Sequence, residues 1–147
     1  MRLAPIVVFD LDGTLANTAH RNHLIDGSFE GYHNLHVRCG DDGLYAETSV
    51  IAKALNRSGF LFWVVTSRPI EVLEKTRAWF FAYMVVPDNI IMRPIGNTQS
   101  GAELKRSWLS DGTLPRERIY CVFDDKDQDV AMWREEGLTC YQVWTAT

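Results

Sequence analysis

The apolar residues of the chain gather in short runs that suit buried strands. Four of these runs are rich in Val, Ile and Phe and are apolar on successive positions, and a shorter fifth run lies near the C-terminus. Continuous apolar runs of this length are typical of strands buried on both faces of a parallel sheet. The predicted strands cover residues 4–11, 59–67, 89–95, 117–125 and 140–144.

Segments with helical periodicity separate these runs, and the first of them closes on a glycine. Strands that alternate with helices of this length form right-handed crossovers. We therefore expect an α/β fold, a three-layer sandwich with a mainly parallel, doubly wound sheet, in a single domain over residues 1–147. The predicted helices cover residues 47–59, 69–84, 101–112 and 127–138.

One irregular region, about residues 17–48, interrupts this alternation. Its first part, residues 17–42, contains three glycines and all four histidines of the chain. Pairs of histidines three positions apart can share a helical face, but no cysteine or second cluster completes a tetrahedral metal site there. We interpret the region as a minimal cap or lid insert. The histidines are His20, His23, His33 and His36.

Composition places the chain among ordinary globular proteins, because 46% of its 147 residues are hydrophobic and 23% are charged. No apolar run approaches the roughly 18 to 20 residues that cross a bilayer, and the start of the sequence lacks the features of a signal peptide. We therefore expect an intracellular, cytoplasmic protein with no membrane partner. The three cysteines, an odd number without metal-site spacing, are expected to be buried free thiols. The net charge of −4 gives no general attraction to nucleic acid, so such binding would need a local basic patch.

Polar residues follow three of the predicted strands, where ligands bind in open α/β sheets. Acids and glycine also end strands simply because they favour turns, but that reading leaves the number of carboxylates unexplained. Like charges repel at close range unless a cation joins them, and Mg²⁺ prefers oxygen ligands. The residues are Asp10, Asp12, Thr66, Ser67, Arg68, Asp124 and Asp125, with Lys105 on a predicted helix that can reach the same edge.

This set of groups can carry out phosphoryl transfer. An aspartate can attack phosphorus and form an aspartyl phosphate, which divides one difficult displacement into two easier ones. A neighbouring acid can protonate the leaving oxygen and later accept a proton from water. A metal ion, a lysine, an arginine and hydroxyl donors would neutralise the charge on the phosphoryl oxygens.

The stretch FDLDGTLA resembles the DxDGT signature of the haloacid dehalogenase (HAD) superfamily of phosphotransferases, and the other superfamily signatures follow in order. The resemblance implies a HAD-like Rossmannoid fold and a Mg²⁺-dependent phosphatase. Asp10 would be the nucleophile and a metal ligand, and Asp12 the general acid/base, which also touches the metal through its backbone carbonyl. An acid at position 12 favours phosphatase over dehalogenase chemistry, since dehalogenases lack it.

The same resemblance implies roles for the later signatures. Thr66 and Lys105 would hold the phosphoryl oxygens. Asp124 would complete the metal shell, with Asp125 as a further ligand or as support for the ligands.

A closer resemblance lies in the C-terminal third, where VFDDKDQDVAMWREEGLTCYQV is similar to the 3′-phosphatase domain of bacteriophage polynucleotide kinase. In that family two arginines bind the substrate phosphate, and Arg21 and Arg68 occupy the matching places. The other reading of Arg21 is a solvated loop cation. Two departures stand out: no GxxxxGK[ST] loop is present, so the kinase half is missing, and Ser67 replaces a glycine beside the phosphate.

The small insert predicts an open site, which suits a phosphorylated nucleic acid end. It also suits a nucleotide whose base stacks on Tyr32, His33 or His36. We favour a polynucleotide 3′-phosphatase slightly over a 5′-nucleotidase, and the acidic net charge, which disfavours nucleic acid binding, is the main reason that the margin is small. Two other classes of protein are less favoured. A signalling receiver domain has its acid pair after the first strand and its acceptor aspartate after the third, which is not the order found here. A non-catalytic binding module on the same fold would not need every catalytic position, and none of them is lost.

The tryptophans are expected to serve the core rather than a ligand. Trp63 lies within a predicted strand, and Trp79, Trp108 and Trp133 lie at apolar helix positions. The position of Trp144 near the C-terminus leaves its role open.

Overall fold

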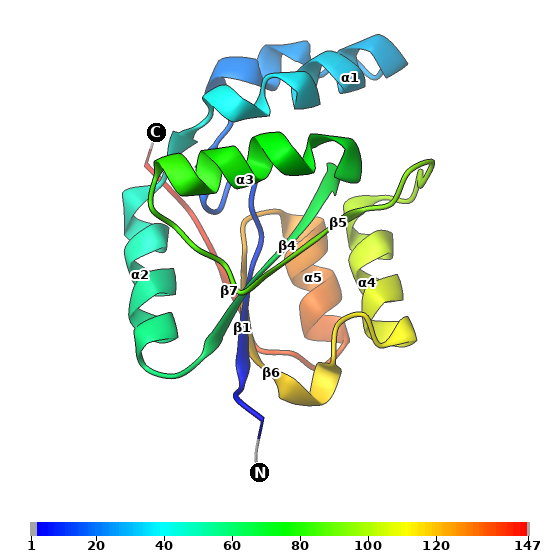
Figure 1. Cartoon of the computed structure of the whole chain (residues 1–147). Coiled ribbons are helices and arrows are strands. Elements are labelled where there is room, and N and C mark those ends of the chain that lie inside the picture. The colour runs from blue at the N-terminus through cyan, green and yellow to red at the C-terminus, as the bar shows by residue number, and fades with distance from the viewer. Residues whose placement is uncertain (1–2, 147) are drawn as a thin grey trace.

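The computed structural model describes residues 3–146, which form a three-layer sandwich (Figure 1). The middle layer is a five-stranded sheet of order β5-β4-β1-β6-β7, parallel throughout. Its strands are β1 (Ile6–Phe9), β4 (Leu61–Pro69), β5 (Asn89–Arg93), β6 (Ile119–Asp124) and β7 (Cys140–Gln142). The prediction of an α/β sandwich with a parallel sheet is confirmed.

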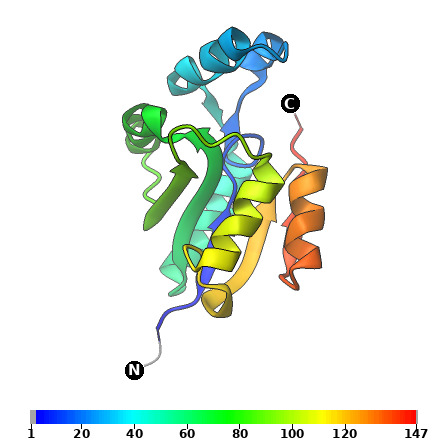
Figure 2. The ribbon, with the colours of Figure 1, turned by 90° about the vertical axis from the view of Figure 1, so that its right-hand side faces the viewer.

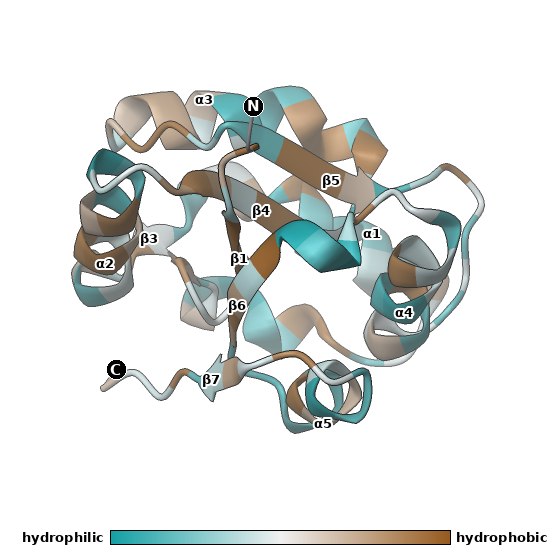
Figure 3. Cartoon of the chain, turned by 90° about the horizontal axis from the view of Figure 1, so that it is seen from below, coloured by the Kyte–Doolittle hydropathy of each residue, from teal (hydrophilic) through white to brown (hydrophobic). Residues whose placement is uncertain are grey.

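Helices cover both faces of the sheet, α2 and α3 on one side and α4 and α5 on the other, as the view in Figure 3 shows. A fifth helix, α1, lies outside the sandwich. The helices are α1 (Phe29–Val37), α2 (Ala46–Arg57), α3 (Leu73–Ala82), α4 (Gly101–Asp111) and α5 (Asp127–Glu135). Short 3₁₀ turns cover Ala19–Leu24, Cys39–Asp41, Ile70–Val72 and Arg116–Arg118.

Strand β1 explains why one apolar run feeds two separate cores. Its four residues are fully buried, and because side chains alternate across a strand they divide between the two faces. Ile6 and Val8 join the core under α4 and α5, with Trp108 and Trp133. Val7 and Phe9 join the core under α2 and α3. The central strand is thereby held from both sides, and with it the residues that follow its carboxyl end.

A small cap stands over the carboxyl end of the sheet (Figures 1 and 2). It leaves the core at β2 (Ala16–Asn17) and returns at β3 (Gly43–Leu44), and the two strands pair antiparallel as a hairpin that forms its base. Between them lie α1 and two 3₁₀ turns. The insert expected at about residues 17–48 is thus a short helical cap, and its last predicted residues belong to β3 and α2.

The structure differs from the predicted boundaries around residue 68. Strand β4 continues to Pro69, which pairs with Arg93 after a shift in register, so Arg68 lies inside the strand and not beyond it. A 3₁₀ turn follows, and α3 begins only at Leu73. Strand β4 stays extended because the Arg68 side chain is anchored to carboxylates at the sheet edge. Helix α3 ends at Ala82, just before Met84 adopts a left-handed φ of 54°.

Most tryptophans and all cysteines lie where the sequence places them. Trp79, Trp108 and Trp133 are buried, and Trp63 is half-buried against the core. Trp144 is 86% exposed. The cysteines are buried and free, as predicted. Within the described residues, none of the helices has the length and apolar character needed to cross a bilayer.

Candidate active site

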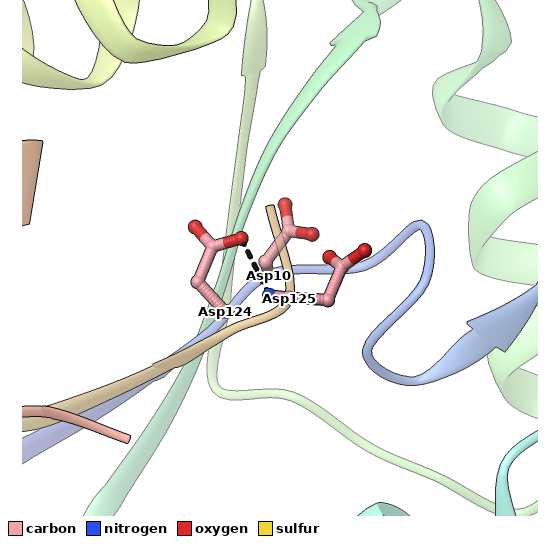
Figure 4. A group of neighbouring side chains, drawn as sticks. All are labelled: Asp10, Asp124 and Asp125. Atoms are coloured by element: carbon pink, nitrogen blue, oxygen red, sulfur yellow. Dashed lines mark hydrogen bonds between the residues drawn. The ribbon is translucent and has the colours of Figure 1, made fainter. Parts of the chain in front are cut away.

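Three carboxylates meet where β1 and β6 end, at the point where the strand order reverses. One carboxylate oxygen from each of Asp10, Asp124 and Asp125 lies within 4.8 Å of the others (Figure 4). The backbone fixes two of them, since Asp10 N–H donates to Phe123 O at 2.9 Å and Asp125 N–H donates to Asp124 Oδ1 at 2.9 Å. Burial and the neighbouring Asp124 raise the pKa of Asp10 well above its usual range. Burial also raises the pKa of Asp125.

The three carboxylates repel one another when they are ionised, and a bound cation would offset that repulsion. A hard divalent ion takes carboxylate oxygens as ligands, and its positive charge would lower the pKa values that burial and repulsion raise. Within residues 3–146, no other group of histidine, cysteine or acidic side chains has the same spacing. The described chain thus contains one aspartate cluster suited to a metal ion, and the histidines of the cap are not part of it.

Lys105 supplies the positive charge beside this cluster. Its Nζ donates to Asp10 Oδ1 at 3.0 Å, to Asp124 Oδ2 at 2.9 Å and to Asp129 Oδ2 at 2.7 Å. Burial alone would lower the pKa of Lys105, but the surrounding carboxylates, Asp10 first, raise it well above its usual range. The ammonium group therefore stays charged. A capping box at the start of α4, formed by Ser100 and Glu103, fixes the first turn of the helix that carries it.

Asp12 sits apart from the three carboxylates and is held by two arginines. Its Oδ1 accepts from Arg21 Nη2 at 3.0 Å, from Arg68 Nη2 at 2.6 Å and from Arg68 Nε at 2.9 Å. Burial would raise the pKa of Asp12, but Arg68 and then Arg21 outweigh it and lower the pKa. Asp12 Oδ2 accepts no hydrogen bond from the residues that the structure describes. Asp12 also lines a cleft that lies next to the three carboxylates.

Asp42 holds the same two arginines from the other side, although nothing in the sequence singled it out. Its side chain is completely buried and accepts from Arg21 Nε at 2.7 Å, Arg21 Nη2 at 2.8 Å and Arg68 Nη2 at 2.6 Å. His20 Nε2 lies 2.8 Å from it as well. The Trp79 indole N–H donates to the Asp42 carbonyl at 2.7 Å, which ties the base of the cap to α3. Arg21 and Arg68 are thus buried in a four-charge cluster and are not solvated.

The DGT turn owes its shape to glycine. Gly13 has a φ of +84°, and a Cβ there would lie 2.1 Å from Asp125 Oδ2, so only glycine lets Asp125 approach the turn. The next residue, Thr14, donates from Oγ1 to Asp125 Oδ1 at 3.1 Å and lies 3.5 Å from Asp10 Oδ2. Thr14 was part of the quoted motif but had not been given a role.

The remaining predicted residues lie at the end of β4. Thr66 is buried, and its Oγ1 accepts from Arg68 N–H at 3.1 Å, which leaves its own hydroxyl proton free to donate. Ser67 lines a cleft of about 630 Å³ that opens above the aspartates and beneath the cap. Tyr32 and His36 of α1 line the same cleft, and their rings pack edge to face with centroids 4.5 Å apart.

The sequence analysis missed two further polar residues: Asp129, which accepts from Lys105, and Arg93, which lines the cleft. His36, named there as a histidine of the insert and a candidate for base stacking, has a buried Nδ1 without a partner in the described chain. Asp129 stands one helical turn into the acidic stretch after Asp125, so its spacing offered a signal. Asp42 lies in an irregular loop, where spacing gives none.

Comparison with known proteins places this geometry in a family. The family model described as the polynucleotide kinase PNKP phosphatase domain matches residues 4–147. A chain in the structure of the Pnkp1/Rnl/Hen1 RNA repair complex superposes with a TM-score of 0.81 at 23% identity, over 95% of this chain but only 42% of that one. A haloacid dehalogenase-like hydrolase from Streptococcus pneumoniae gives a TM-score of 0.66 at 14% identity, over 93% of this chain and 83% of that one.

The structural likenesses show a shared HAD-like fold, and the family model covers nearly the whole chain. The resemblance seen in the sequence is thereby confirmed. This chain belongs to the family of polynucleotide kinase PNKP phosphatase domains and is a HAD-type phosphatase.

Proposed function

We propose that this protein is a Mg²⁺-dependent phosphomonoesterase that removes the 3′-phosphate from a nucleic acid end through an aspartyl phosphate on Asp10. The observation that carries the chemistry is the meeting of Asp10, Asp124, Asp125 and Lys105 at one sheet edge, in a chain of the PNKP phosphatase family. Each group has a task in phosphoryl transfer.

Asp10 attacks phosphorus in the first step. A bond forms between its carboxylate oxygen and phosphorus, and the bond from phosphorus to the 3′ oxygen of the sugar breaks. Asp12 gives a proton to that leaving oxygen from Oδ2, the oxygen that no arginine holds. In the second step water attacks the phosphoryl group, Asp12 takes the proton from that water, and phosphate leaves Asp10 free.

The two arginines set the proton affinity of Asp12. They keep it ionised in the substrate-free protein, which is the form that accepts a proton from water. An incoming phosphate brings negative charge next to Asp12 and competes for Arg21 and Arg68, so it raises the proton affinity of Asp12 when a donor is needed. Asp42 keeps both arginines in place during this change.

Lys105, Thr66 and Ser67 stabilise the phosphoryl oxygens. The Lys105 ammonium and the Thr66 hydroxyl are buried at the floor of the cleft, where a donor acts more strongly than it does in water. Asp10, Asp124 and Asp125, with the backbone carbonyl of Asp12, would hold Mg²⁺. The bound ion supplies positive charge that orients the phosphate and offsets charge in the transition state.

The family and the open cleft support a nucleic acid end as substrate. The chain spans 42% of the matched chain in the structure of the Pnkp1/Rnl/Hen1 RNA repair complex, so the proposal covers the phosphatase step alone. The alternative is a 5′-nucleotidase. The aromatic pair of Tyr32 and His36 favours it, because these rings lie in the cleft wall and could stack on the base of a nucleotide.

A matched panel separates these substrates. Phosphate release would be measured with Mg²⁺ and with EDTA from 3′- and 5′-phosphorylated oligonucleotides and from the 3′ and 5′ mononucleotides. The proposal predicts the highest kcat/KM for the 3′-phosphorylated oligonucleotide and no release in EDTA. A preference for the 5′ mononucleotide would establish the alternative, and equal release in EDTA would overturn the metal-dependent mechanism.

A further inference from the structure

The active-site cleft continues into a side cleft that the chemistry above does not use. The main cleft, of about 630 Å³, and the side cleft, of about 410 Å³, share two lining residues, Tyr32 and Arg93. The side cleft lies between the start of α1 and the chain that follows β5. Its volume is in the range of pockets that bind small ligands, about 300 to 1,000 Å³. Other lining residues are Phe29, Pro69, Glu71, Pro94 and Gln99.

Arg93 stands at the junction of the two clefts with its charge uncompensated. Its Nε donates to Ser67 O at 2.9 Å, and its Nη1 donates to Asn97 Oδ1 at 2.7 Å and to Gln99 O at 2.6 Å. All of these acceptors are neutral, and Arg93 makes no ion pair within residues 3–146. Its side chain is largely buried, and its Nη2 has no hydrogen-bond partner in that range yet is not enclosed.

Such an arginine differs from the other two arginines of the site. Arg21 and Arg68 are each paired with two carboxylates, whereas Arg93 is positioned by neutral groups and keeps one donor available. Burying a cation without a counterion is costly, so its place in the fold is best explained by an anion that binds there. Its bond to Ser67 puts it next to the residues that are proposed to hold the substrate phosphate.

The wall of the side cleft suits a nucleobase. Tyr32 is half-exposed, and its ring is steadied by the edge-to-face contact with His36. Phe29, one turn earlier on α1, is 86% exposed and lines the same cleft. Aromatic faces at the edge of a charged groove accept bases of any sequence by stacking.

The opposite exit from the main cleft lacks this combination. A cleft of about 410 Å³ also begins there, at Trp144, and Tyr141 lines it. Its one charged lining residue is Glu47, which repels a phosphate. The side cleft is lined by a cation, Arg93, as well as an acid, Glu71, whereas this exit is lined by an acid and by no cation, so only the side cleft offers a positive charge to a strand that leaves the active site.

We propose that Arg93 and Tyr32 form a second-nucleotide subsite, in which Arg93 binds the phosphodiester next to the 3′-terminal nucleotide and Tyr32 stacks on the adjoining base. The inference rests on the proposed 3′-phosphatase function and makes it more specific. The preferred substrate is then a strand of at least two nucleotides with a flexible, single-stranded 3′ end.

The test removes one charge from the substrate and one from the protein. Two 3′-phosphorylated thymidine dinucleotides are compared, one with a phosphodiester linkage and one with an uncharged methylphosphonate linkage. We expect the wild-type protein to prefer the phosphodiester about tenfold in kcat/KM, which corresponds to about 1.4 kcal/mol. Arg93→Gln should abolish that preference. Arg77→Gln is the matched control, because Arg77 is exposed on α3 outside the cleft, and it should keep the tenfold preference.

A ratio of two substrates on the same variant is insensitive to any general loss of activity from disturbing the loop that Arg93 holds. The subsite is overturned if Arg93→Gln keeps the tenfold preference, or if the wild-type protein shows none. If neither dinucleotide releases phosphate, the proposed function fails. Fluorescence anisotropy with both labelled dinucleotides and the Asp10→Asn protein then decides the subsite, because tenfold tighter binding of the phosphodiester supports it and equal binding refutes it.

Discussion

Asp42 is the residue whose loss should disturb the fold and the site together. The change Asp42→Asn keeps the shape of the side chain but removes the charge that faces Arg21 and Arg68. Both guanidinium groups are buried, with exposures of 1% and 0%, and Asp42 is itself completely buried. Only Asp12, whose side chain is 31% exposed, remains to compensate two cations.

Removing one partner from a buried charge cluster costs about 3 to 5 kcal/mol. Because Asp12 still compensates part of the charge, we expect a value near the lower end, about 3 kcal/mol in the free energy of unfolding. For a chain of this size that corresponds to a fall in Tm of about 10 °C. Urea unfolding followed by circular dichroism measures the change directly.

The neighbouring Asp41 provides a matched control, since it is an exposed aspartate in the same turn. Asp41→Asn should stay within about 0.5 kcal/mol of the wild type, as surface substitutions usually do. If Asp42→Asn also stays within that margin, Asp42 does not hold the arginines, and the explanation for their burial is wrong.

Three further predictions concern the turn, the cap and the metal. Gly13→Ala should sharply reduce phosphate release because its Cβ would collide with Asp125, whereas Gly112→Ala, also at positive φ but in open space, should cost only the backbone strain of about 1 kcal/mol and leave turnover intact. Burial lowers the pKa of His36 from 6.5 to about 4, so between these pH values the unfolded chain binds a proton at this histidine and the folded protein does not. Its contribution to stability is therefore present above pH 6.5 and lost as the pH falls towards 4, and urea unfolding across this range should show about 3 kcal/mol more loss for the wild type than for His36→Leu. Mg²⁺ at a hundred times its Kd should stabilise the wild-type protein by about 2.7 kcal/mol and should have little effect on Asp124→Asn, as thermal unfolding with and without EDTA will show.

The sheet and the aspartates at its edge could be predicted because they depend on local pattern. A strand buried on both faces must be apolar at successive positions, and β1 and β6 carry that signature. Once the strands are parallel, their carboxyl ends share one edge, so Asp10 and Asp124 come together with no further information.

The charge cluster behind them could not be predicted in the same way. Asp42 reaches Arg68 across 26 positions of chain, and it does so from a loop whose path depends on the cap hairpin and on the bond from Trp79. The arginines themselves were predicted, but as phosphate ligands, with no sign that each would be buried between two acids. Arg93 was overlooked because it is a single cation at the end of β5, and none of the recognised sequence signatures includes it.

The extent of β4 shows a further limit. Proline is common at the first position of a helix, and the helical pattern that follows predicted a helix from Pro69. The structure continues the strand because the Arg68 side chain is bonded to Asp12, Asp42 and Thr76, which are contacts between distant parts of the chain. Tertiary contacts of this kind override local preference.

The central claim is that Asp10 performs the chemistry, and one measurement tests it most directly. Phosphate release from a 3′-phosphorylated oligonucleotide in Mg²⁺ would be compared for the wild type, Asp10→Asn and the control Asp41→Asn, with circular dichroism to show that all three are folded. We predict release by the wild type and by Asp41→Asn and none above background by Asp10→Asn. Turnover by folded Asp10→Asn within tenfold of the wild type would contradict the account.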